Sequence, residues 1–190
     1  GLLVVLLLVI FIGALFTDQD KVMYVSIFDK YAAPGAISAE GTKFILGADE
    51  GGRDVLGQLI IGARNSVTIG FAITVITSII GVGLGIISGY YGGIVDNILM
   101  RVVDFIMILP IMLIIIVFVS IISNYNVWSF IFIMSAFYWV GKARLFRSKT
   151  LSEARRDYVS ASKTMGTGDF KIMFREIMPN LSSLIITNLT

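Results

Sequence analysis

The stretch RRDYVSASKTMGTGDFKIMFREIMPN, which runs from Arg155 to Asn180, decides how the rest of the sequence is interpreted. It is basic and of helical composition, and glycines at Gly166 and Gly168 interrupt it. Long apolar runs lie on both sides of it. A charged segment in this position is typical of a loop that joins two membrane spans and lies at the membrane surface.

The composition indicates a membrane protein. Of the 190 residues, 56% are hydrophobic and 15% are charged, whereas a soluble domain carries about 25% charged residues. The net charge of +2 is too small to favour nucleic acid as a partner. Because the sequence has no Cys and no His, it offers no disulfide, no thiol nucleophile, no zinc site of the usual ligand types and no histidine acid–base chemistry. We therefore expect no metal site and no cofactor.

Uncharged runs predict the membrane spans and an all-α fold. The run 105–141 is too long for one crossing at about 1.5 Å per residue, so we divide it at the polar cluster 123–126 into a tight hairpin. The expected elements are a truncated first span at 1–16 (or a signal-peptide core), a span within 65–95, the hairpin 102–122 and 127–140, and the start of another span at 181–190. This predicts a polytopic helix bundle with about four full spans and the start of a fifth. Both ends lie inside apolar runs, so we expect a piece of a longer protein.

Residues 17–66 are expected to form a loop with an amphipathic helix, and 67–190 a transmembrane core that includes a basic loop at 142–180. Within the first loop, residues 46–56 read as a turn that leads into the helix, whose apolar face would carry Leu56, Leu59, Ile60 and Ala63. The alternative is a helix that lies along the membrane and leads directly into the next span. Residues 88–101 are expected to form a short turn, with tyrosines at the membrane interface.

Small residues and a proline mark contacts and bends in the spans. Gly81, Gly85 and Gly89 recur every four residues, which predicts a face where another helix approaches closely. Pro110 is expected to kink its helix, as a static bend or as part of a gate. Asp104 is interpreted as an ion-pair partner of Arg101, three residues away.

Charge asymmetry predicts the orientation. The segment 141–180 has nine basic against four acidic residues, and the segment 17–64 has five basic against seven acidic. By the positive-inside rule the basic segment is cytoplasmic. Counting spans backward places 17–66 outside and the N-terminus inside.

The basic segment is expected to form two short amphipathic helices that meet at a corner, 166–169. Thr150 and Glu153 suggest a capping box, Gly166 a left-handed C-cap, and Pro179 the end of the second helix. The expected apolar faces are Leu151, Ala154, Tyr158, Ala161 and Met165, then Phe170, Met173, Phe174 and Ile177. Two interpretations fit: helices that lie on anionic lipid, or a lever to which a cytoplasmic partner docks.

The same segment resembles the EAA loop of the permease subunits of bacterial ABC importers. The resemblance rests on 158–166, Asp169, Ile172, 174–175 and 177–180. Around it, the motifs at 46–64 and 89–104 and the proline at Pro110 are similar to the C-type dipeptide/oligopeptide permeases. The sequence departs from the family pattern where Ser160 replaces the usual glutamate, Ser162 an alanine, and Glu176 a frequent histidine.

The resemblance implies a type I ABC-importer permease in a bacterial inner membrane, with the N-terminus and the coupling loop cytoplasmic. Such a subunit pairs with a homologous permease, docks onto two ATP-binding subunits and receives peptides from an extracytoplasmic binding protein. It is not itself an enzyme, and the sequence shows no P-loop. The implied ATPase-coupling residues are Tyr158, Ser160, Ala161, Ser162, Gly166, Asp169, Pro179 and Asn180.

Two alternatives remain open at this point. A nickel or other small-solute permease of the same family would share these motifs. A channel or secondary transporter that works without ATP would instead place ionisable groups deep in its spans, where Asp104 is the candidate.

Overall fold

The computed structural model describes residues 2–38, 41–122 and 126–189, and the described residues are helices and turns with two isolated β-bridges and no strand. The all-α prediction is confirmed. The helices are α1 (Leu2–Phe16), α2 (Gln19–Met23), a 3-10 turn (Ile27–Asp29), α3 (Val55–Tyr91), α4 (Gly93–Ile108), α5 (Ile111–Ile121), α6 (Val127–Glu153), α7 (Asp157–Thr164), α8 (Asp169–Ile172), a π-helical turn (Met173–Ile177), α9 (Met178–Asn180) and α10 (Ser182–Leu189). The predicted turn at 123–125 lies outside the described residues.

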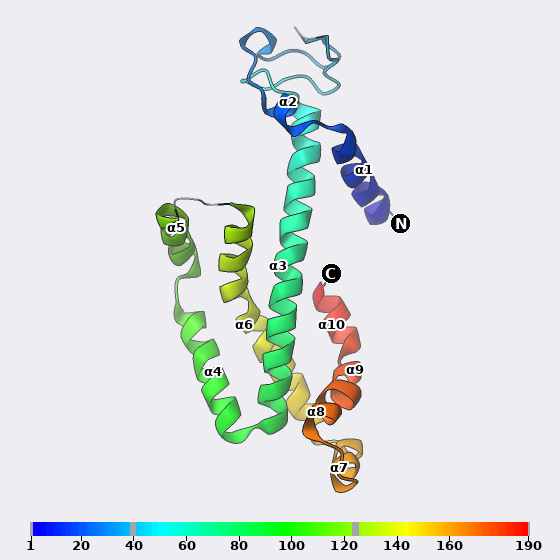
Figure 1. Ribbon diagram of the computed structural model, residues 1–190, viewed down its shortest axis with the longest axis vertical. Coiled ribbons are helices and arrows are strands. Elements are labelled where there is room, and N and C mark those ends of the chain that lie inside the picture. The colour runs from blue at the N-terminus through cyan, green and yellow to red at the C-terminus, as the bar shows by residue number, and fades with distance from the viewer. Residues whose placement is uncertain (1, 39–40, 123–125, 190) are drawn as a thin grey trace. The chain divides into compact units, whose positions relative to one another are not determined.

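The chain divides into two compact units, 1–70 and 71–190. Two predicted boundaries differ from the structure, because α3 is one continuous helix. It joins the expected amphipathic helix to the following span without a break near residue 66. It also continues to Tyr91, so the turn expected at 88–101 is reduced to Gly92 (Figure 1).

In the first unit, the segment before α3 folds around the carboxylate of Asp49. Its Oδ1 accepts hydrogen bonds from the backbone N–H of Arg53 (3.0 Å) and of Gly51 (2.8 Å), and its Oδ2 accepts from the Arg53 guanidinium and from Gln58. The hydrogen bond from the Arg53 backbone is the largest cause of a lowered pKa at Asp49. Gly52 has a φ of +73° and lies against the carbonyl of Ser26, where a Cβ atom has no room.

The same unit corrects the expected amphipathic face. Gly57 and Ile61 are buried, whereas Leu59 is 57% exposed. Gly57 is buried because it faces Val22 of α2 at the distance of a tight contact. A small residue that packs against another helix carries no signal in a hydrophobic periodicity.

In the second unit, α3 and α6 approach backbone to backbone along a ridge of glycines. A Cβ atom on Gly81 would lie 2.8 Å from the carbonyl oxygen of Trp139, and one on Gly85 would lie 2.7 Å from that of Ala143. At Gly89 the distance to the carbonyl oxygen of Arg147 would also be 2.7 Å. The partners on α6 recur every four residues, as the glycines do, so side chains larger than hydrogen are excluded along the whole contact.

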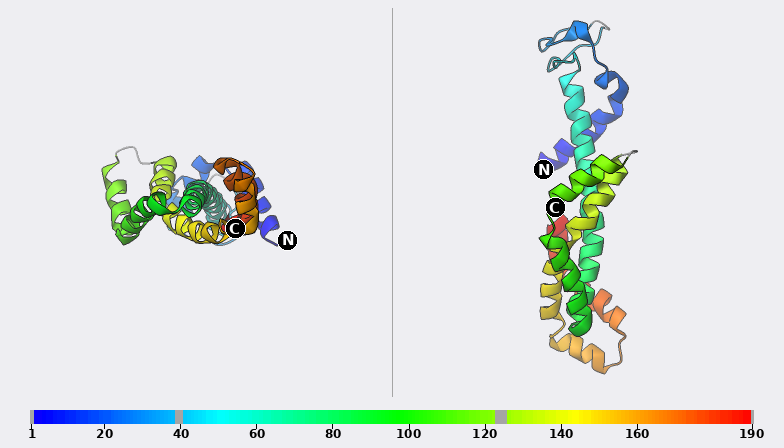
Figure 2. Two further views of the ribbon diagram at one scale, coloured as in Figure 1. Left: turned by 90° about the horizontal axis from the view of Figure 1, so that it is seen from below. Right: turned by 90° about the vertical axis from the view of Figure 1, so that its left-hand side faces the viewer.

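The helices α4 and α5 are separated at Leu109 and Pro110 and bend by 78°. Pro110 precedes α5 as its N-cap, so the chain leaves the helix completely at this point. In Figures 1 and 2, α3 lies between α4 and α5 on one side and α8 to α10 on the other.

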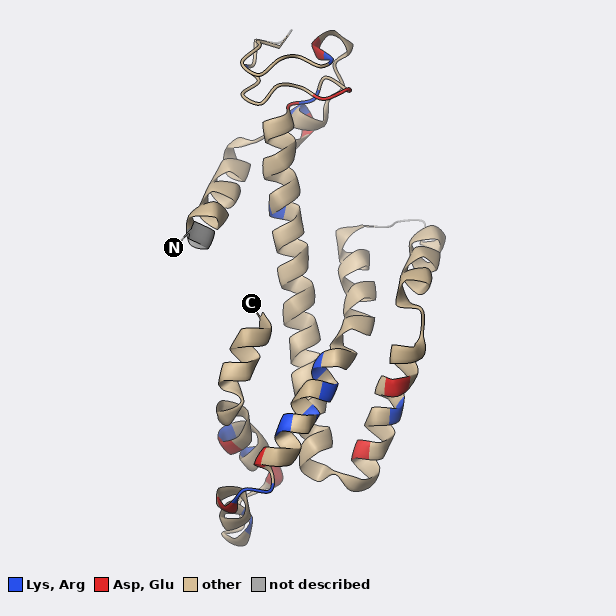
Figure 3. Ribbon diagram, turned by 180° about the vertical axis from the view of Figure 1, so that it is seen from behind, with Lys and Arg blue, Asp and Glu red and all other residues tan. Residues whose placement is uncertain are grey.

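By length and apolar composition, one described helix, α3, can cross a membrane, and α4 with α5 pass the same test only as a bent pair. The apolar helix α1 is shorter. Helix α6 becomes charged from Lys142 onward. In the second unit the charged residues gather toward the end that carries α7 and the turn between α3 and α4 (Figure 3).

Candidate functional site

The corner between α7 and α8 is formed by a glycine in the left-handed conformation. Gly166 has a φ of +77° and follows the C-cap Met165. Its N–H donates to the carbonyl of Lys163 (3.0 Å), and the N–H of Thr167 donates to the carbonyl of Ser162 (3.0 Å). These two bonds make a Schellman motif. A Cβ atom at Gly166 would meet nothing within 4 Å, so glycine is favoured here by conformation and not by lack of space.

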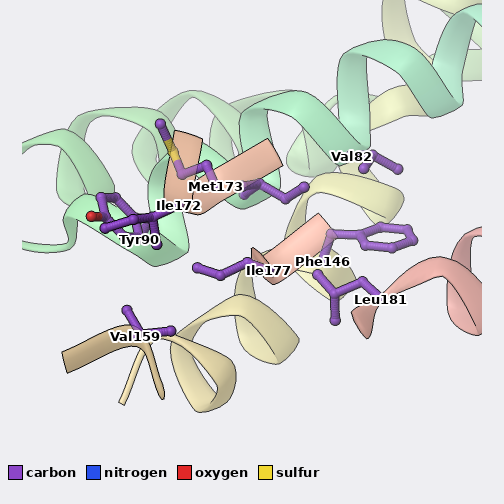
Figure 4. Close-up of a cluster of buried hydrophobic side chains, with 9 residues drawn as sticks. Val82, Tyr90, Phe146, Val159, Ile172, Met173, Ile177 and Leu181 are labelled. Carbon is purple, nitrogen blue, oxygen red and sulfur yellow. The ribbon is translucent and has the colours of Figure 1, made fainter. Parts of the chain in front are cut away.

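The inner face of the corner packs into the main apolar core of the second unit. In Figure 4, side chains from α7, α8 and the π-helical turn meet side chains from α3 and α6. The members of this core are Val82, Ile86, Tyr90, Phe146, Val159, Ile172, Met173, Ile177 and Leu181. The corner is therefore fixed to both long helices by apolar contact.

The expected apolar stripe on the first arm is only partly right, because Ala154 and Tyr158 pack against the core but its last two residues do not. Ala161 and Met165 are exposed, and Val159 and Ser162 are buried instead. The reason is that α6 extends to Glu153 and α7 begins only at Asp157, so the periodicity counted across this turn joins two different helices. For the same reason Thr150 is no N-cap: it lies buried inside α6.

The outer face of the corner carries three exposed apolar side chains, which we call the corner surface. Met165 is 75% exposed, Phe170 70% and Phe174 40%. The rings of Phe170 and Phe174 pack together with centroids 4.4 Å apart. This corrects the expected second face, since Phe170 and Phe174 point outward while Met173 and Ile177 are buried. Large apolar side chains grouped on a polar surface indicate an interaction site.

Two of the predicted coupling residues, Tyr158 and Asn180, are hydrogen bonded to each other. The side-chain amide of Asn180 donates to the Tyr158 hydroxyl (3.0 Å), which donates to Oε2 of Glu153 (3.0 Å). Burial, followed by the Glu153 carboxylate, raises the pKa of Tyr158. The hydroxyl thus stays protonated and connects the end of α6, α7 and α9.

Of the remaining predicted residues, Ser162 bonds to the second arm and Ser160 does not. The Ser162 hydroxyl donates to Oε1 of Glu176 (2.8 Å), while the other carboxylate oxygen of Glu176 is buried without a partner among the described residues. Ser160 lies exposed on α7. Pro179 does not end a helix: it lies within α9, which follows the π-helical turn without a break.

Asp169 forms a side-chain hydrogen bond with Tyr90 of α3. Its Oδ1 accepts a hydrogen bond from the Tyr90 hydroxyl (2.6 Å), and the ammonium of Lys163 lies 4.5 Å from the centre of the Tyr90 ring. The sequence interpretation placed Tyr90 at the membrane interface. The two residues are 79 positions apart, so no local spacing could have paired them.

Ion pairs fasten α4 to α6 next to the corner. Arg147 binds both carboxylate oxygens of Asp96, which is 8% exposed and also accepts from the Ser88 hydroxyl. Asp104 pairs with Arg144 of α6 and not with Arg101 as expected. Asp104 therefore has a cationic partner on the neighbouring helix.

An all-α chain with a helix long and apolar enough to cross a membrane, and a basic corner packed against it, fits the class of membrane proteins. The family model described as "Binding-protein-dependent transport system inner membrane component" matches residues 81–190. The chain belongs to this family, and the predicted family membership is confirmed.

Curated relatives agree. The chain is 53% identical over 188 residues to the oligopeptide transport system permease protein OppC of Lactococcus lactis subsp. cremoris (strain SK11), covering 99% of this chain and 62% of that protein. It is 40% identical over 149 residues to the dipeptide transport system permease protein DppC of Haemophilus influenzae, covering 77% and 50%. The oligopeptide transport system permease protein OppC of Bacillus subtilis is 34% identical over 144 residues, covering 76% and 47%. The chain thus spans less than two thirds of the length of these relatives.

Proposed function

We propose that the chain forms part of the translocation path of an ATP-driven peptide importer. Peptide cargo is supported by the relatives named above, which are oligopeptide and dipeptide permease proteins. The family description supports delivery by a separate binding protein. The other partners in this proposal are a homologous permease subunit and two cytoplasmic ATP-binding subunits, which carry out the hydrolysis.

The observation that carries the proposal is the corner, which has two faces with different tasks. Its inner face is buried against α3 and α6, whereas Met165, Phe170 and Phe174 face outward. Lys171 and Arg175, which follow Phe170 and Phe174 in the sequence, are exposed. An apolar centre with a charged rim is the usual anatomy of a protein–protein contact. A partner that moves this surface displaces the helices behind it.

Co-purification of the ATP-binding subunits with the full-length permease tests this role. Phe170→Asp places a charge in the centre of the corner surface, and Gly166→Trp strains the Schellman turn. Both should reduce recovery of the ATP-binding subunits. Ile45→Asp, at a side chain that is 62% exposed in the first unit, is the matched control and should recover them as the unsubstituted protein does. Full recovery with Phe170→Asp would mean that the corner surface contacts lipid instead.

The proposed orientation places the basic loop in the cytoplasm and the segment before α3 outside. The hydrogen bond between Tyr90 and Asp169 supports one side for both the Gly92 turn and the basic loop. A cysteine at Ser160 should be shielded from an impermeant thiol reagent in intact cells, and a cysteine at Ile37 should react. The opposite labelling pattern would reverse the orientation.

A further inference from the structure

Tyr90 contacts both helices that form the corner, α7 and α8, which we call its two arms. Its hydroxyl donates to Asp169, the first residue of α8, and its ring receives the ammonium of Lys163 in the last turn of α7. Gly166 lies between these two residues in the sequence. The two arms therefore close around one side chain, which belongs to neither of them.

The two contacts use different chemistry. The bond to Asp169 is a hydrogen bond to a carboxylate, which is shorter and stronger than one between neutral groups. The contact with Lys163 is a cation–π interaction with the ring face. Tyr90 itself is 8% exposed, whereas Asp169 and Lys163 are both exposed. Removing the hydroxyl alone breaks the first contact and leaves the second in place.

Tyr90 is also positioned to pass movement to the long helix. It lies in the last turn of α3, whose side chains Val82 and Ile86 belong to the same apolar core as the inner face of the corner. The glycine ridge fixes α3 to α6 through backbone contact. The corner, α3 and α6 thus form a continuous set of contacts in the second unit, and Tyr90 supplies a hydrogen bond between the corner and α3.

We infer that Tyr90 is a positioning residue that fixes both arms of the corner to α3, so that the corner and α3 move as one body. The use of this connection in transport rests on the proposed function. The connection itself does not, and it can be measured without any partner.

The test places spin labels on the corner and on α3 in the full-length protein in lipid nanodiscs. The 190-residue sequence contains no Cys, and Met165 and Ile79 are 75% and 70% exposed, so cysteines introduced there accept nitroxide labels. Pulsed electron–electron resonance then gives the distribution of distances between the two labels. We expect one narrow peak for the protein with native Tyr90.

Tyr90→Phe should broaden or split this peak, and Asp169→Leu, which removes the hydrogen-bond acceptor, should do the same from the other partner. Tyr91→Phe makes the same chemical change one residue away, where the structure gives no side-chain hydrogen bond to the described part of the chain, and should keep the narrow peak. The midpoint of thermal unfolding, measured alongside, identifies a variant that fails to fold. A folded Tyr90→Phe protein with an unchanged peak overturns the inference.

A second measurement uses the complete importer in proteoliposomes. With Tyr90→Phe, the ATP-binding subunits should still co-purify, but their hydrolysis should lose its stimulation by the binding protein. Normal stimulation would contradict the inference while leaving the proposed function intact. Failure of the unsubstituted protein to recruit ATP-binding subunits would instead contradict the proposed function.

Discussion

The Ser162 hydroxyl donates a 2.8 Å hydrogen bond to Oε1 of Glu176 and so joins two positions at which the sequence departs from its family pattern. One lies on α7 and the other in the π-helical turn. The bond crosses the corner from arm to arm. The two positions at which the family resemblance led us to expect other residues are thus in direct contact.

Ser162→Ala should destabilise the chain, because it leaves both carboxylate oxygens of Glu176 without a donor. An unsatisfied buried polar group costs about 1–3 kcal/mol, which thermal unfolding in detergent would measure. Ser160→Ala, at an exposed position on the same helix, should change little. The double substitution Ser162→Ala with Glu176→Met should recover most of the loss, and equal instability of the single and double variants would contradict the pairing.

Gly85→Ala should destabilise the contact between α3 and α6, because the new methyl group would lie 2.7 Å from the carbonyl oxygen of Ala143. Overpacking of this kind costs about 1–3 kcal/mol. Gly83→Ala is the matched control on the same helix, since a Cβ atom there meets nothing within 4 Å. It should stabilise α3 by up to about 1 kcal/mol through helix propensity. A lower unfolding midpoint for both variants would show that the glycines act through flexibility.

The Asp49 turn should lose stability in acid. Since the hydrogen bond from the Arg53 backbone, followed by those from Gln58 and the Arg53 side chain, lowers the pKa of Asp49 in the folded protein, the folded form binds a proton less readily than the unfolded form. Its stabilising effect is therefore complete above the unfolded pKa of about 3.9 and is lost as the pH falls below that value.

Limited proteolysis of the segment before α3, as a function of pH, would measure this effect. Asp49→Asn should make cleavage faster at neutral pH and remove most of its increase in acid. Glu50→Gln, the neighbouring exposed carboxylate, is the control and should keep the acid-dependent increase. An identical pH profile for Asp49→Asn and the unsubstituted protein would contradict the assignment.

Arg147→Met should destabilise the second unit far more than Arg144→Met. The first substitution leaves Asp96 buried and unpaired, which costs about 3–5 kcal/mol. The second breaks the exposed pair with Asp104 between the same two helices, worth about 0–1 kcal/mol. Comparison of the two unfolding midpoints provides the measurement. Similar losses in both variants would mean that burial does not distinguish the pairs.

Local sequence signals indicated several elements of the structure, because they depend on backbone chemistry. Gly166 lies where a left-handed C-cap requires glycine, and the chain bends at Pro110, which lacks an N–H. The repeat of Gly81, Gly85 and Gly89 lies against α6. Each of these features is a property of one short segment.

The errors arose where the signal was not local. The apolar stripe from Leu151 to Met165 assumed one helix, but the chain turns after Glu153. The pairings of Tyr90 with Asp169 and of Asp104 with Arg144 depend on the packing of distant helices, which no spacing encodes. Gly57 contacts Val22 as a small residue, and hydrophobic patterns do not register such contacts.

The matched ridges of α3 and α6 have a mechanical consequence. Glycines recur every four residues on α3, and the backbone carbonyls that they meet recur every four residues on α6. The two surfaces therefore match only in registers that differ by this repeat. Four residues at about 1.5 Å each give a repeat of about 6 Å along the helix axis. Any shorter displacement of α3 along α6 moves larger side chains against the carbonyls. Sliding of α3 along α6 is therefore permitted only in steps of this repeat. For smaller displacements α3 and α6 must move together.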